Sequence, residues 1–156
     1  MTHYHSWLEC IRGCGRRYSI YDVIYRCEAC GALLDVEHDI DALQDHSAAA
    51  WMSRFEQRAR STAWPYQSGI WAKKEWVCPQ IDDANIVSLG EGNTALLHNP
   101  RLGEALGAPD LWIKQCGVSQ TGSFKDLGMT VLVSVVNQMR ADGKPIQAVA
   151  CASTGD

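Results

Sequence analysis

Apolar residues recur every three or four positions in two stretches of the chain, which predicts two amphipathic helices. Trp51, Phe55 and Ala59 form one stripe within 47–60, a stretch rich in residues that favour helix. The second helix is predicted over 124–140, and its apolar face consists of Phe124, Leu127, Val131, Leu132, Val135, Val136 and Met139. Each helix is therefore expected to pack against the rest of the chain through one face.

Two short apolar runs, at 110–115 and 146–151, flank the second predicted helix and are typical of strands. A strand, a helix and a strand of these lengths predict a βαβ unit and hence a parallel sheet. A parallel sheet needs more strands than these two. We therefore expect an α/β fold with an incomplete parallel sheet, in a sequence that is the front part of a larger enzyme.

Composition narrows the class of protein. The chain has 156 residues, 14 Lys and Arg against 18 Asp and Glu, and 46% hydrophobic residues, which fits a folded globular protein rather than a disordered one. This mild acidity argues against a dedicated nucleic-acid binder. No apolar run approaches the ~20 residues of a membrane span, and the first thirty residues lack an export signal. We therefore expect a cytoplasmic protein without membrane or nucleic-acid partners. Its cysteines are expected to be metal ligands or thiols rather than to form disulfides.

Two cysteine pairs, each followed directly by a glycine, lie in the first forty residues: Cys10 with Cys14, and Cys27 with Cys30. Residues 16–26 between them contain strand-forming side chains, so a hairpin would bring four sulfurs together around one tetrahedral zinc ion. The alternative is a metal-free ribbon whose cysteines are packed or partly oxidised.

The remaining candidate ligands show no such pattern. Three isolated cysteines are expected to be core or loop thiols, namely Cys78, Cys116 and Cys151. Three histidines could replace a cysteine at the metal but have no regular spacing, namely His3, His5 and His38.

These features divide the chain into three predicted parts. Residues 1–40 form a small zinc-ribbon-like module, residues 41–87 form a helical and aromatic-rich connecting segment, and residues 88–156 begin a catalytic domain. Within the connecting segment, residues 61–80 carry three tryptophans and are expected to pack on a neighbour rather than to serve as a plain linker.

The loop before the second predicted helix carries the most informative chemistry. Ser123 and Asp126 resemble a capping box, which places Lys125 in the first turn of the helix. A cation there opposes the helix dipole, whereas a neutral amine would be favoured and can condense with an aldehyde. The alternative is a solvated lysine at a helix start. A nucleotide-binding P-loop is excluded, because Ser123 stands where its lysine would be required.

Two further loops are candidates for ligand binding. The glycine-punctuated segment 88–95, which contains Thr94, is either a turn beside a substrate cleft or simply a turn. Ser153, Thr154 and Asp156 follow the strand predicted at 146–151, and ligands bind at the carboxyl ends of strands in open α/β sheets. The hydroxyls could hold a substrate carboxylate, and Asp156 could accept a hydrogen bond from a cofactor hydroxyl.

Four segments together resemble the plant-like branch of the threonine synthase family, among the fold-type-II enzymes that use pyridoxal phosphate. They are Cys27–His38, Leu89–Thr94, Thr121–Met129 and Cys151–Asp156, which occur in the order of the family and span most of the chain. The lysine motif and the Ser-Thr-Gly-Asp loop are the most specific of these, whereas cysteine modules occur in many families.

The resemblance implies that Lys125 is the Schiff-base lysine and that Asp156 contacts the cofactor. It further implies that Ser153, Thr154 and Thr94 contact the substrate. The implied reaction converts O-phospho-L-homoserine and water to L-threonine and phosphate, in an enzyme that is a homodimer when complete. The family's phosphate-binding glycine loop lies beyond this sequence, so these 156 residues alone are expected to be inactive.

Three alternatives to this function remain at the level of sequence. The first two are a serine or threonine ammonia-lyase and a cysteate synthase-like enzyme with the same fold. The third is a non-catalytic zinc-ribbon binding module.

Overall fold

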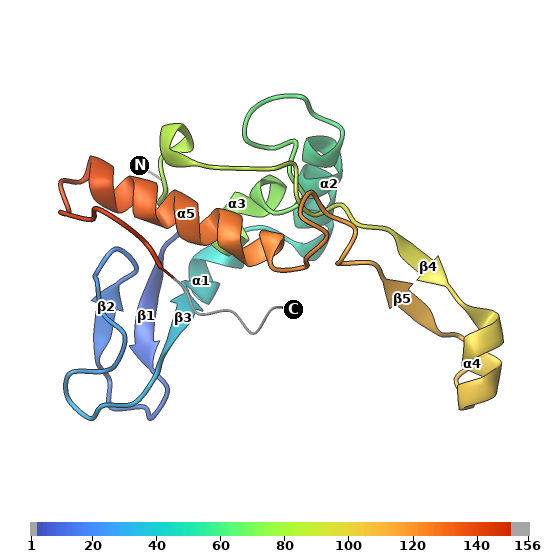
Figure 1. Cartoon of the computed structure of the whole chain (residues 1–156), viewed down its shortest axis with the longest axis horizontal. Coiled ribbons are helices and arrows are strands. Elements are labelled where there is room, and N and C mark those ends of the chain that lie inside the picture. The colour runs from blue at the N-terminus through green and yellow to red at the C-terminus, as the bar shows by residue number, and fades with distance from the viewer. Residues whose placement is uncertain (1–2, 151–156) are drawn as a thin grey trace.

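The cysteine-rich N-terminal part folds into a three-stranded antiparallel sheet. In the computed structural model, which describes residues 3–150, β1 (Ser6–Cys10) lies between β2 (Arg17–Ser19) and β3 (Leu34–His38) (Figure 1). The predicted hairpin between the cysteine pairs is confirmed only for β2, because the chain turns away after Ser19. Neither β1 nor β3 was predicted from the sequence.

Short helices build most of the connecting segment. They are α1 (Ile40–Leu43), α2 (Ala48–Ala59), the 3-10 helices η1 (Trp71–Lys73) and η2 (Asp83–Asn85), and α3 (Lys74–Val77). The helix predicted over 47–60 is confirmed as α2, and the Ser47 hydroxyl caps it by accepting from the N–H of Ala50 at 3.2 Å. Within residues 3–150, no helix has both the length and the apolar composition that crossing a membrane requires.

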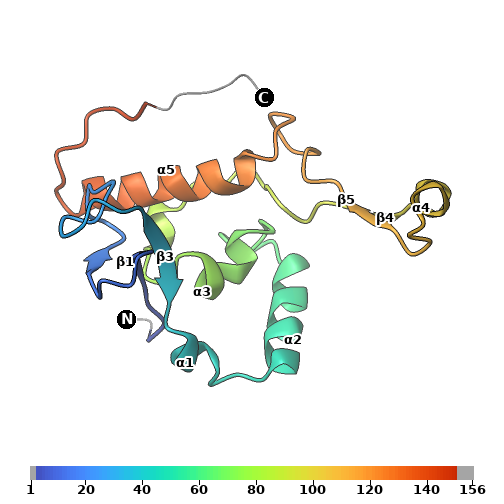
Figure 2. The same ribbon diagram turned by 90° about the horizontal axis from the view of Figure 1, so that it is seen from below.

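The tryptophan-rich stretch packs against its neighbours, as predicted, and supplies Trp71 to the main core. Trp71 has no exposed surface and packs with Cys78, Ile81 and Ile86. The indole N–H of Trp71 donates to the carbonyl of Val87 at 3.1 Å, so its one polar atom is satisfied. This core lies beneath α5 (Asp126–Ala141), whose Val131 and Val135 pack against it (Figure 2).

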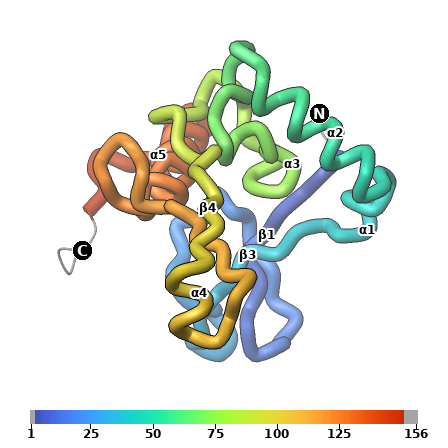
Figure 3. Tube along the Cα trace, turned by 90° about the vertical axis from the view of Figure 1, so that its right-hand side faces the viewer, coloured from blue at the N-terminus to red at the C-terminus, as the bar shows by residue number. Residues whose placement is uncertain are grey.

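A two-stranded arm projects from the body. It consists of β4 (Leu96–His98), α4 (Pro100–Leu106) and β5 (Trp112–Lys114). Figures 1 and 2 show that it extends away from the other elements, and Figure 3 views it end-on. Leu96 lies opposite Lys114 in an antiparallel register. The strand predicted at 110–115 therefore exists, but its partner is β4.

The predicted parallel sheet is not present in residues 3–150. All strand pairing there is antiparallel, and residues 146–150 are not in a strand. A strand requires a hydrogen-bonded neighbour, and β5, its expected partner, is paired within the arm. The fold described by residues 3–150 is thus mixed α/β, without the predicted βαβ pairing.

Helix α5 buries only part of the predicted face. Its bounds agree with the expected 124–140, and Met139 of the predicted face is buried, but the other buried residues are polar, namely Asp126, Thr130, Ser134 and Gln138. The predicted apolar face is only partly covered. It lines a cavity of about 610 Å³ together with residues of β1, β3 and 146–150.

Hydrogen bonds from the polar residues of α5 join this helix to residues 82–87. The Ser134 hydroxyl accepts from the N–H of Val87 at 2.7 Å and donates to the carbonyl of Thr130 at 2.6 Å. Gln138 Oε1 accepts from the N–H of Asp82 at 2.9 Å and from Asn85 Nδ2 at 2.8 Å. Because these groups are shielded from water, each bond satisfies an atom that would otherwise be costly to bury.

Replacing Ser134 with alanine is expected to lower the free energy of unfolding by about 1–3 kcal/mol, because the N–H of Val87 loses its acceptor. Urea unfolding measures this change. The exposed Ser53 of α2 provides a matched control, and Ser53→Ala is expected to stay within about 0.5 kcal/mol of the unmodified protein. Equal losses in the two variants would show that the Ser134 contact does not stabilise the fold.

Candidate functional site

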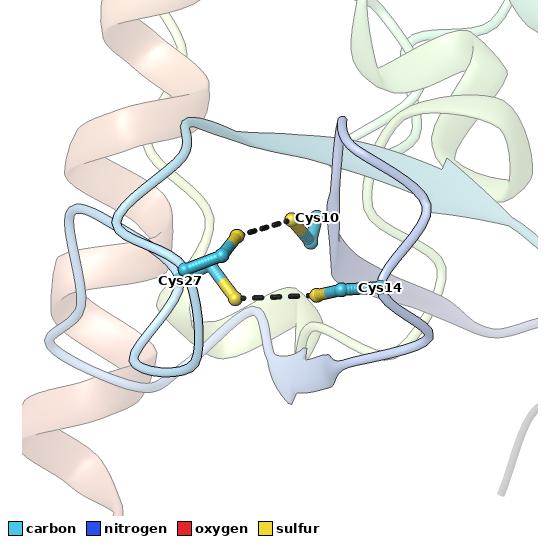
Figure 4. Close-up of side chains that lie close together, drawn as sticks. Cys10, Cys14 and Cys27 are labelled. Atoms are coloured by element: carbon cyan, nitrogen blue, oxygen red, sulfur yellow. Dashed lines mark hydrogen bonds between the residues drawn. The ribbon is translucent and has the colours of Figure 1, made fainter.

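The four paired cysteines converge on one point. Their Sγ atoms all lie within 4.8 Å of one another, with 3.4 Å between Cys10 and Cys30 and 3.5 Å between Cys14 and Cys27 (Figure 4). A tetrahedral zinc ion with bonds of ~2.3 Å to sulfur places its ligands about 3.8 Å apart, which is close to these distances. The separations exceed the ~2.05 Å of a disulfide, so the residues are free thiols in a metal-binding arrangement.

Two similar turns place these sulfurs. Gly15 and Gly31 follow the second cysteine of each pair at φ of +71° and +70°, the left-handed conformation that favours glycine. The hydroxyl of Tyr18 lies 3.5 Å from the sulfur of Cys27 and donates to it, which lowers the pKa of that thiol. A zinc ligand must be a thiolate, so this contact supports metal binding.

The other candidate ligands lie outside this cluster. His3 contacts Asp45 at 3.4 Å, and His38 ends β3. Cys78 belongs to the Trp71 core, where burial raises the pKa of its thiol to about 11. The prediction of a core thiol is confirmed for Cys78, whereas Cys151 lies outside the described residues.

Lys125 lies at the entrance to α5. The helix begins at Asp126, so Lys125 is the N-cap residue, and its main-chain N–H donates to the Ser123 hydroxyl at 3.3 Å. Its carbonyl accepts from the N–H of Met129 at 2.9 Å, while its Nζ lies 5.9 Å from the ring centre of Phe124. The main chain of Lys125 therefore starts the helix, and its side chain takes no part in capping.

The predicted capping box is not formed. The helix begins at Asp126, so Lys125 precedes the first turn instead of lying in it. The Asp126 carboxylate accepts from Thr121, from its N–H at 3.0 Å and from its hydroxyl at 2.6 Å, rather than from the N–H of Ser123. Ser119 donates to the carbonyl of Ser123 at 2.8 Å and closes the same loop. This network fixes the main chain on both sides of Lys125.

The hydrogen bonds from Thr121 lower the pKa of Asp126 below its ordinary value. A lowered folded-state pKa contributes stability above the unfolded pKa of ~3.9, and this contribution is lost as the pH falls through the folded value. Asp126→Asn is therefore expected to lower the melting temperature at pH 7, and the deficit should shrink below about pH 4. Thermal melts from pH 7 to pH 3 test this, with the exposed Glu56→Gln as control. A deficit that stays constant with pH would contradict it.

The glycine-punctuated loop 88–95 lies at the same end of the arm as the lysine loop, which is the segment 115–125 that contains Lys125. Residues 88–95 lead into β4 and residues 115–125 lead out of β5, and the antiparallel register places both at the body end (Figure 1). Gln115 donates through its N–H to the carbonyl of Ala95 at 2.9 Å, and Lys114 Nζ donates to the carbonyl of Thr94. The structure thus brings the glycine-punctuated loop beside the start of the lysine loop.

The third predicted loop lies outside the described residues. Ser153, Thr154 and Asp156 all fall in the range 151–156. The residues that are described fit pyridoxal phosphate in one respect. A primary amine stands at a helix start in a loop with three hydroxyl side chains, and an amine of this kind condenses with an aldehyde.

Comparison with known proteins supports this chemistry. Residues 87–156 match the family described as "Pyridoxal-phosphate dependent enzyme". The chain is 54% identical over 140 residues to Threonine synthase 2, chloroplastic, of Arabidopsis thaliana. The matched region covers 89% of this chain and 27% of that protein. It is 37% identical over 148 residues to the threonine synthase of Methanocaldococcus jannaschii, covering 95% of this chain and 32% of that protein. The chain thus spans about a third of these relatives' length.

The lysine loop and the arm that precedes it thus lie within the segment that matches the pyridoxal-phosphate-dependent enzymes. Along nearly its whole length the chain is similar to the threonine synthases, so the resemblance in its motifs is confirmed.

Proposed function

We propose that this chain is the N-terminal part of a lyase that converts O-phospho-L-homoserine and water to L-threonine and phosphate. The observation that carries the proposal is the position of Lys125 at the entrance to α5, within the segment that matches the family. Two hydrogen bonds between Thr121 and Asp126 hold the main chain around it. The similarity to proteins named threonine synthase supports this substrate over those of the ammonia-lyases and cysteate synthases.

In this proposal Lys125 Nζ would hold the aldehyde group of the cofactor. Pyridoxal phosphate, when bound, would supply an electron sink for charge that develops on the substrate carbons. The Lys125 amine would also accept and return protons at those carbons. Thr94 is proposed to bind the substrate with Ser153 and Thr154, and Asp156 to contact the cofactor.

Phosphate release from O-phospho-L-homoserine tests the proposed reaction. The protein in its natural length, supplied with pyridoxal phosphate, is expected to form L-threonine and phosphate in equal amounts. The 156 residues alone are expected to be inactive, as predicted from the sequence. Ammonia release from L-threonine without phosphate release from O-phospho-L-homoserine would instead favour an ammonia-lyase.

A structural zinc ion is proposed for the four cysteines of the N-terminal sheet. Cys10 and Cys27 are buried, and the core around them contains only Ala32, with Tyr18 and Leu34 packed against it. So small a core gives little hydrophobic stabilisation, which metal ligation would supplement. The cysteine turns lie away from the first turn of α5, so the ion is assigned no part in the reaction (Figures 1 and 2).

Three broader expectations stay predictions. The division at residues 40 and 87 into ribbon, connecting segment and catalytic domain is one. Homodimer formation by the complete protein is the second, and light scattering would test it. A cytoplasmic location is the third, and the name of the Arabidopsis relative gives that protein a chloroplast location instead.

A further inference from the structure

Two loops cross at the edge of the Trp71 core with their main chains in contact. A Cβ atom on Gly69 would lie 2.2 Å from the main-chain nitrogen of Asn93, and one on Gly92 would lie 2.7 Å from Cα of Gly69. Real Cβ atoms do not approach other atoms so closely, so only glycine fits at either position. The N–H of Gly69 donates to the carbonyl of Glu91 at 2.8 Å and ties the loops together at the crossing.

A buried carboxylate strengthens this crossing. Glu91 is 2% exposed and Ser68 is fully buried, and the Ser68 hydroxyl donates to Glu91 Oε1 at 2.6 Å. Glu91 Oε2 accepts from the Ser88 hydroxyl at 3.0 Å and from the N–H of Leu89 at 2.7 Å. Hydrogen bonds from both loops therefore hold the two carboxyl oxygens of this nearly inaccessible side chain in place.

The Ser68 hydroxyl is itself held in place. It accepts from the N–H of Ile70 at 3.1 Å and from the N–H of Trp71 at 3.3 Å, at the entrance to η1. Trp71 is fully buried in the core, so the core holds the Ser68 hydroxyl, and through it the Glu91 carboxyl group, in position.

The crossing joins the catalytic segment to residues outside it. The family match begins at residue 87, so Glu91 lies within it, whereas Ser68 and Gly69 belong to the connecting segment. Thr94 follows Glu91 by three residues. It lies at the body end of the arm, beside the start of the lysine loop. The connecting segment therefore fixes the main chain of the loop that leads to Thr94, the residue proposed above to bind the substrate.

We propose that Ser68 and Glu91 are positioning residues, which set the loop 88–94 so that Thr94 can bind the substrate. This inference rests on the proposed function. It assigns to the connecting segment a role in substrate affinity, beyond linking the cysteine-rich sheet to the catalytic domain.

Steady-state kinetics of the protein in its natural length test the inference, with O-phospho-L-homoserine as substrate. Ser68→Ala and Glu91→Gln are each expected to raise KM about tenfold and to leave kcat within about twofold, because Lys125 is not touched. The double variant is expected to show no larger rise than the stronger single variant, since both substitutions break one contact. Glu91→Asp, which keeps the charge but shortens the side chain, is expected to raise KM as well and serves if another variant does not fold.

Another set of hydrogen bonds in the connecting segment, made by Gln80, provides the control. Gln80 makes three hydrogen bonds to Ser6, at 2.7, 3.1 and 3.2 Å, and these join it to β1 rather than to the loop 88–94. Gln80→Ala is expected to lower the melting temperature without changing KM. Variants of Ser68 and Glu91 that melt earlier but keep the original KM would overturn the inference, as would rises in KM that multiply in the double variant. An unmodified protein that releases no phosphate would instead overturn the proposed function, and the substrate role of the loop with it.

Discussion

Replacing Lys125 with alanine is expected to abolish the visible absorbance of bound pyridoxal phosphate and to lower kcat/KM at least about 10³-fold. Loss of a positioned proton-transfer group alone reduces rates by 10²–10⁴-fold, and this substitution also removes the amine that holds the cofactor. The fold should survive, because Lys125 contributes main-chain atoms rather than its side chain to the start of α5.

Lys144→Ala is the matched control for this substitution. Lys144 is half-exposed and contacts Asp22 at 3.6 Å, so its loss is expected to leave both absorbance and turnover unchanged. Absorbance spectra, activity and far-UV circular dichroism of the two variants separate lost chemistry from lost structure. A Lys125→Ala protein that keeps its visible band would show that another lysine holds the cofactor.

Removing zinc is expected to unfold the cysteine-rich sheet and to leave the rest of the protein folded. Structural zinc sites contribute on the order of 10 kcal/mol or more, which exceeds what the small core around Cys10 and Cys27 can supply. Treatment with a chelator should therefore expose the amides of β1 and β3 to rapid hydrogen exchange, while those of α5 stay protected.

Cysteine variants identify the ligands. Cys27→Ser is expected to lose the ion, because it removes a buried ligand, whereas Cys116→Ser should retain one zinc per chain. Elemental analysis measures both. A purified protein without zinc, whose melting is unaffected by chelator, would contradict the metal assignment.

The sequence predicted those features that depend on neighbouring residues. Helix α2 was predicted because a run of helix-favouring residues carries a repeating apolar stripe, and the cysteine cluster because two cysteine pairs, each followed by a glycine, recur at a short spacing. Both features are specified within a few residues of the chain, so no knowledge of the tertiary structure was needed.

Features that depend on distant partners could not be predicted in this way. The buried face of α5 includes polar residues because Ser134 and Gln138 find hydrogen-bond partners in 82–87, which periodicity does not reveal. Strand β5 pairs with β4 rather than with residues 146–150 because the chain folds back through α4, a choice that apolar runs alone do not specify.

The contact between Ser68 and Glu91, which holds the loop 88–94, was missed for the same reason. Glu91 looks like an ordinary turn residue in sequence, and its burial follows only from the approach of Ser68 and Gly69. Two glycines about twenty positions apart, in segments that also carry a serine and a glutamate, were the available signal. That signal is too common to have indicated a contact.

Reductive labelling of the unmodified protein tests the central claim most directly. The natural-length protein is treated with pyridoxal phosphate and borohydride, digested, and mapped by mass spectrometry. A stoichiometric pyridoxyl group on the peptide that contains Lys125 is the expected result. A label on a different lysine, such as Lys114 at the end of the arm, would contradict the assignment of Lys125 and the function built on it.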